Sequence, residues 1–195
     1  SDTLTFFSTD SVYVTRAGDI TAWQGWIVIS DFYAKTVRLF DFSFHYKGSL
    51  GRRGAGPGEF TNFPLLVPAG ESLWLFDDGL MRASMFGKDL KLHTIKPLPG
   101  EYYFRRQAVW LGDKFVVSLN PPRMLERASS LKGEAPLAIL DTNLQVVRRF
   151  WTWDDVYASD DLAWSTYAYE NIDVLLAPAW DGGLFALQKA SYLVT

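Results

Sequence analysis

Phe40-Asp41-Phe42-Ser43-Phe44, Phe86-Gly87-Lys88-Asp89-Leu90 and Leu140-Asp141-Thr142-Asn143-Leu144 follow one pattern. Each stretch joins the apolar end of one predicted strand, through a short polar turn, to a new apolar strand. The repeat also extends upstream, because Trp26–Asp31, Leu73–Asp78 and Phe115–Asn120 stand in equivalent positions. Self-similarity at a period of this size indicates an array of supersecondary units, and units built only from short strands are typical of propeller blades.

Each unit is predicted to hold four antiparallel strands separated by turn residues. In the first unit we expect the strands at Asp19–Trp23, Trp26–Ser30, Thr36–Phe40 and Phe44–Leu50, and in the second at Phe63–Val67, Leu73–Phe76, Arg82–Phe86 and Leu90–Ile95. A partial fourth unit follows around Leu184–Leu187. The sequence therefore predicts an all-β propeller domain over residues 1–195, with three complete blades and most of a fourth, at about residues 18–51, 60–97, 104–150 and 172–195.

The bulk composition narrows the class of protein. Of 195 residues, 48% are hydrophobic, 21% charged and 16% aromatic, which is typical of a folded protein rich in β-structure. A net charge of -3 gives no field that would gather phosphate backbones, so nucleic acid is not expected as the main partner. No apolar run is long enough for a transmembrane helix, and the absence of cysteine leaves the cellular compartment open.

Unequal spacing between the units locates two insertions, at residues 121–135 and 151–171. In a four-stranded meander, the loop between strands two and three lies at the same end as the link to the next blade. Both insertions are therefore expected on one face, which also receives Arg52-Arg53, Asp31-Tyr33 and Asp77-Asp78. Loops on a rigid scaffold are where binding sites usually lie, so this face is the predicted ligand-binding face.

The link between the first two units is Gly51-Arg52-Arg53-Gly54-Ala55-Gly56-Pro57-Gly58-Glu59-Phe60. Four glycines and a proline indicate a tight, specific turn, and the link opens a strand where a phosphate-binding loop would open a helix. Together with the strand pattern of units one to three, it closely resembles the G-x-x-G-x-G-P-G-E-F link of NHL-type and bacterial six-bladed β-propeller proteins.

This resemblance implies a toroid of six blades, often in exported or lipid-anchored bacterial proteins, with the ligand at the mouth of the central channel. On that basis we expect an extracytoplasmic location, a lipid anchor outside the given sequence as one option, and a chain that is part of a larger propeller. The alternative is a closed four-bladed ring, in which Leu4–Phe7 or Val12–Arg16 supplies the missing outer strand of blade four.

No catalytic constellation stands out, and no cofactor is expected. His45 and His93 fall on predicted outer strands, away from a channel where zinc would need about three converging protein ligands. Asp77-Asp78, Asp154-Asp155 and Asp160-Asp161 offer hard oxygen ligands, so calcium is an alternative to no metal at all.

The sequence favours a non-catalytic binding or assembly module for a protein, peptide or glycan. An enzyme of the propeller lyase or lactonase kind, with catalytic residues in further blades, is one alternative, and an RNA-binding NHL-type domain is another. Arginines on the predicted face suit anionic groups, while the aromatic insertion suits stacking on sugars or anchoring of a partner. The candidate ligand-binding residues are Arg52, Arg53, Asp31, Tyr33, Asp77, Asp78, Arg123, Arg127, Trp151, Trp153, Tyr157, Trp164 and Tyr167.

Overall fold

A computed structural model describes residues 14–99, 103–120, 137–150, 173–178 and 184–189 of the chain. The chain divides into two compact units, residues 1–98 and 99–195, which we describe separately. Every regular element in the described residues is a β-strand, and three of the sheets are four-stranded and antiparallel. The predicted all-β fold built from propeller-type blades is therefore confirmed.

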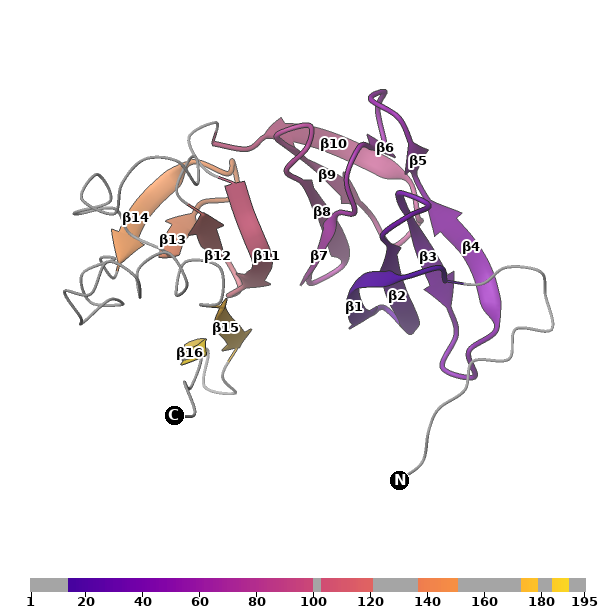
Figure 1. Cartoon of the computed structure of the whole chain (residues 1–195), viewed down its shortest axis with the longest axis horizontal. Helices are drawn as coiled ribbons and strands as arrows, with labels where there is room; N and C mark the ends of the chain where they lie inside the picture. The colour runs from indigo at the N-terminus through magenta and orange to yellow at the C-terminus, as the bar shows by residue number, and fades with distance from the viewer. Residues whose placement is uncertain (1–13, 100–102, 121–136, 151–172, 179–183, 190–195) are drawn as a thin grey trace, which may run out of the picture. The chain divides into compact units, whose positions relative to one another are not determined.

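The first unit contains two complete blades (Figure 1). In each blade four consecutive strands pair in chain order, so the sheet is a simple meander. Predicted and observed strands agree to within two residues, and the third strand of each blade matches at both ends. The strands are β1 (Ala17–Trp23), β2 (Trp26–Asp31), β3 (Thr36–Phe40) and β4 (Tyr46–Leu50) in blade one, and β7 (Leu65–Ala69), β8 (Ser72–Asp77), β9 (Arg82–Phe86) and β10 (Leu92–Pro97) in blade two.

An apolar layer joins the two blades of this unit. Strand alternation places Val28, Val37, Leu39 and Leu50 on the face of blade one that packs against blade two. The first strands of the two blades, β1 and β7, lie side by side (Figure 1). The Leu66 N–H of β7 donates to the Asp19 carboxylate of β1 at 2.8 Å. The two blades thus share one core and form one body.

Turn geometry corrects the predicted register of the repeat. Lys35 and Met81 take positive φ in the turns between strands two and three, and Phe44 and Leu90 do so between strands three and four. Both pairs are 46 residues apart. Asp31 is therefore equivalent to Asp77, and the predicted equivalence of Asp31 with Asp78 was wrong by one residue.

The second unit begins with a complete blade formed by β11 (Tyr103–Trp110), β12 (Phe115–Asn120), β13 (Leu137–Leu140) and β14 (Val146–Phe150). Its turn between strands three and four repeats the positive φ at Leu144, whose side chain is fully buried. The hairpin of β15 (Asp173–Pro178) and β16 (Leu184–Lys189) follows, with β15 beside β11. The third strand expected for this last blade, and the Leu4–Phe7 segment, lie outside the described residues.

Candidate functional site

The glycine-rich link between blades one and two folds into a small structure of its own. Its ends form β5 (Arg52–Arg53) and β6 (Glu59–Phe60), a two-stranded parallel pair that the sequence did not predict. Gly51 has a φ of 68°, and a Cβ there would overlap the Phe60 ring and the Gly58 carbonyl oxygen. Only glycine combines an easily adopted positive φ with the absence of a Cβ, which explains this part of the motif.

Two side chains hold the link from the inside. Arg82, at the start of β9, donates to the carbonyl oxygens of Ala55 at 3.1 Å, Glu59 at 2.9 Å and Gly56. The Glu59 carboxylate accepts from the Gly56 N–H at 2.8 Å and from Arg52 Nε at 2.7 Å. These contacts, the backbone bond first and Arg52 second, lower the pKa of Glu59. Arg52 therefore has an internal carboxylate partner.

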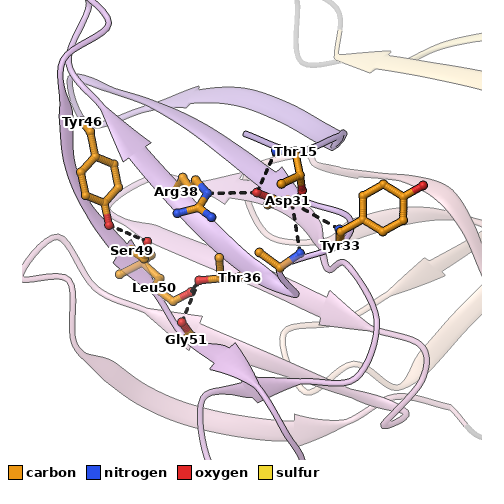
Figure 2. A network of polar contacts seen from close by, with 10 residues as sticks. Thr15, Asp31, Tyr33, Thr36, Arg38, Tyr46, Ser49, Leu50 and Gly51 are labelled. Carbon is orange, nitrogen blue, oxygen red and sulfur yellow. Dashed lines mark hydrogen bonds and ion pairs between the residues drawn. The ribbon is translucent and has the colours of Figure 1, made fainter. Parts of the chain in front are cut away.

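Asp31 ends β2 and organises the turn that follows it (Figure 2). Its side chain is fully buried and accepts hydrogen bonds from the Tyr33 and Ala34 N–H groups at 3.2 Å each, from Thr15, and from Arg38 Nε at 3.0 Å. Burial opposes ionisation, but the hydrogen bonds outweigh it and lower the pKa of Asp31. This carboxylate stabilises the blade by accepting the hydrogen bonds of the turn.

Asp77 plays the same part in blade two. It accepts from the Gly79 N–H at 2.9 Å, the Leu80 N–H at 3.3 Å and the Thr61 N–H at 2.9 Å. No cation in the described part of the chain pairs with Asp77, and burial raises its pKa above the ordinary value. The neighbouring Asp78 accepts from the Asn62 amide at 2.7 Å. Among the described residues, Arg52 pairs with Glu59 and Asp31 with Arg38.

The turn after Asp31 carries a surface cluster that we call the Phe32 cluster: Arg16, Phe32, Tyr33, Lys35 and Phe63. The Arg16 guanidinium lies 4.6 Å and the Lys35 ammonium 4.4 Å from the Phe32 ring centroid. Phe63 packs on the same ring at 4.9 Å, and Tyr33 meets it edge to face at 5.2 Å. Tyr33 is nevertheless 60% exposed, and its ring points away from the Asp31 network (Figure 2).

The charges of this cluster have no counterion within the described part of the chain. Neither Arg16 nor Lys35 makes an ion pair there, and Lys35 Nζ has only a long contact of 3.5 Å with Asn62 Oδ1. Since both cations flank one ring, they lie at most about 9 Å apart and repel by roughly 0.5 kcal/mol or more at the dielectric constant of water before salt screening. An anion placed between them would remove this cost.

The link lies at the same end of blade one as the Phe32 cluster. Thr36 directly follows Lys35, and its hydroxyl donates to the carbonyl oxygens of Gly51 at 2.8 Å and Leu50 at 3.3 Å, which places the start of β5 there. Arg53 is exposed and makes no ion pair with any described residue. Turns and link thus share one face, as strand direction predicted.

Sequence reasoning found Tyr33 and Arg53 but missed Arg16, Phe32, Lys35 and Phe63. Arg16 precedes β1 and Phe63 precedes β7, so only the three-dimensional fold brings them to the turn after β2. The two aromatic residues followed by a lysine in Phe32-Tyr33-Ala34-Lys35 were the available signal. The remaining predicted residues, Arg123, Arg127, Trp151, Trp153, Tyr157, Trp164 and Tyr167, lie outside the described residues, as do Asp154-Asp155 and Asp160-Asp161.

Both histidines lie near the opposite strand ends and pair with a local aspartate. His45 Nδ1 is 3.3 Å from Asp41 Oδ2, and His93 Nε2 is 2.9 Å from Asp89 Oδ1. His45 stands in the turn before β4 and not on the strand, which corrects its predicted position. Within the described ranges, no group of three or more potential metal-binding side chains comes together.

Comparisons with known proteins support the fold. No family model and no curated protein matches the chain. The crystal structure of a "Putative exported protein" from Bacteroides fragilis is similar to it with a TM-score of 0.59 and 15% identity, over 75% of this chain and 40% of that one. The β-propeller domain of Cps50 (Swd1) from Myceliophteria thermophila is similar with a TM-score of 0.50 and 13% identity, over 92% of this chain and 51% of that one.

These likenesses define the class of fold, an all-β arrangement of propeller blades, and at such identities they define the fold alone. The chain spans less than two thirds of the length of either structure. None of the parts of the chain that the structure describes contains a helix of the length and hydropathy needed to cross a membrane.

Proposed function

We propose that the chain is a non-catalytic binding module, whose ligand-binding face is the end of blades one and two that carries the Phe32 cluster and the link. The ligand is a protein, peptide or carbohydrate. The supporting observation is a contrast within this face. Asp31, Glu59 and Arg82 make hydrogen bonds that hold the turns and the link, whereas Tyr33 is exposed and the cations beside it make no ion pair with a described residue. A rigid support under an exposed aromatic side chain is the arrangement expected of a binding site.

The wider assignment is part of the same proposal. The link motif favours an NHL-type, six-bladed bacterial propeller of which this chain is a portion. The likeness to a structure described as a putative exported protein favours an extracytoplasmic location. The arginines at 121–135 and the aromatic insertion at 151–171 are proposed to contribute to ligand binding as well, because insertions in a repeat protein map to loops, where binding sites usually lie.

Arrays of synthetic peptides and of purified glycans, probed with the labelled full chain, test this proposal. Ligands that bind the native protein should lose most of their signal with Tyr33→Ala. The matched control is Phe42→Ala, since Phe42 is 65% exposed in the turn between β3 and β4, at the other end of the same blade. Equal binding by the two variants to every ligand, or no ligand at all on either array, would refute the proposed face.

A further inference from the structure

We infer that the Phe32 cluster recognises an acidic segment of a protein partner, with Arg16 and Lys35 binding its carboxylates and Tyr33 packing against its backbone or apolar side chains. This inference rests on the proposed function and narrows it to one class of ligand. Three features of the cluster support it: the cations are held in place, the described part of the chain supplies no anion for them, and one aromatic ring remains exposed.

The cations are held in place before any ligand arrives. Phe32 is fixed by its N–H, which donates to the Arg16 carbonyl oxygen at 2.7 Å, and by packing against Phe63. Its ring then attracts both cations, an interaction that orients long side chains which would otherwise sample many rotamers. Lys35 is further constrained by the backbone bond of its N–H to the Asp31 carbonyl oxygen at 3.0 Å. Binding therefore costs less side-chain entropy than at an isolated lysine.

No described carboxylate at this end of the blades is available to neutralise these cations. Asp31 is buried beneath the turn and pairs with Arg38, whose side chain is only 16% exposed. Glu59 pairs with Arg52, and Asp78 accepts from Asn62. Asp19 and Asp77 accept from the backbone N–H groups of Leu66 and Thr61, respectively. Arg53 adds a further exposed positive charge on the same face. The result is a local excess of positive charge on a chain whose net charge is -3, which favours an anionic partner.

The kind of anion follows from what remains exposed. The π surface of Phe32 is occupied by Arg16 and Lys35, so it offers no platform for stacking on a sugar ring. Tyr33 is then the exposed ring of the cluster, fixed by its edge-to-face contact with Phe32. A single ordered tyrosine beside arginine and lysine resembles the anchors of protein–protein interfaces, where Tyr and Arg are enriched.

The test uses the full chain and a fluorescein-labelled peptide that alternates Glu with Leu and Tyr, measured by fluorescence anisotropy. The matched probe is the same peptide with Lys in place of Glu. We expect saturable binding of the acidic peptide only, weakening as salt approaches ~0.15 M, where surface charges are screened. Arg16→Gln and Lys35→Asn should each weaken binding roughly two- to fivefold, as expected for exposed charge pairs, and the double variant about tenfold. Asn suits position 35 because its φ is 52°.

Lys91→Asn is the control, because Lys91 is an exposed lysine of the same unit in the turn between β9 and β10, at the other end of the strands. Backbone amide shifts on peptide addition, read by NMR, should concentrate at residues 32–36 and 61–63. A peptide that binds the control and the double variant equally, or shifts amides elsewhere, overturns the inference. So does tighter binding of polygalacturonate than of the peptide at these residues, although the proposed face would then survive. If the acidic peptide does not bind and no array ligand binds in a Tyr33-dependent way, both proposals are overturned.

Discussion

Replacement of Asp31 by alanine should destabilise the first unit far more than any other single change in its turns. The substitution leaves the N–H groups of Thr15, Tyr33 and Ala34 without their acceptor. It also leaves the Arg38 guanidinium, 16% exposed, without the carboxylate 3.0 Å away. Removal of one partner from a buried ion pair costs about 3–5 kcal/mol, because the remaining charge stays buried and unpaired.

The assay is native-state hydrogen exchange, which reports unfolding of each unit separately. Slowly exchanging amides of Val28 and Val37, both fully buried, should lose about 3–5 kcal/mol of protection, while those of β12 and β13 should keep theirs. Asp41→Ala is the control, since Asp41 holds the next turn through the N–H groups of Ser43 and His45 but is partly exposed. The loss of protection in Asp41→Ala should be clearly smaller than in Asp31→Ala.

A double variant separates the two causes of the loss. In Asp31→Ala combined with Arg38→Met, the unpaired charge is gone and only the turn donors lack their acceptor. The double variant should therefore be more stable than Asp31→Ala alone, although it carries one more substitution. Refutation would take either of two results: Asp31→Ala costs no more than Asp41→Ala, or Arg38→Met adds its own loss to that of Asp31→Ala.

Three further predictions concern the link and the second turn. Gly51→Ala should unfold the first unit at lower urea than Gly25→Ala, because both have positive φ, costing about 1–2 kcal/mol, but only Gly51 would also overlap its neighbours. Arg82→Met should cost about 2–3 kcal/mol, since three carbonyl oxygens lose a charged donor, and should speed exchange of the Gly54 N–H, measured by NMR. The raised pKa of Asp77 means that its folded form binds a proton more tightly than its unfolded form; stability should therefore fall as the pH rises from 3.8 through the folded pKa. Urea unfolding of Asp77→Asn across this range should show a weaker fall, and an unchanged slope would contradict the assignment.

The fold was largely predictable from the sequence because equivalent strand and turn residues recur in each repeat and so locate its strands. Thr36–Phe40 and Arg82–Phe86 were placed correctly at both ends, since each is a short, mostly buried run between clear turn signals. The error between Asp77 and Asp78 arose because two adjacent aspartates follow the same apolar strand. Only the backbone N–H groups of Gly79 and Leu80 decide which carboxylate turns inward.

The site was less predictable because its parts come from different strands. Tyr33 follows from its place in a turn, but Phe63 joins it through the register between blades one and two, which no local pattern contains. The ion-pair partners of the charged residues could not be predicted from the sequence either. Arg38 lies seven residues from Asp31 in sequence, and antiparallel pairing of β2 with β3 brings them together.

The excess of positive charge on the binding face follows from the turn chemistry of the blade itself. In blades one and two, the turn between strands two and three contains a residue of positive φ and directs its free N–H groups back toward the strand end. A carboxylate at that strand end satisfies these donors, and it is then buried beneath the turn. Cations in the turn, such as Lys35, have no comparable internal acceptor and stay at the surface. In blade one this arrangement buries the carboxylate of Asp31 and leaves Lys35 near the surface, even on a chain with a net charge of -3.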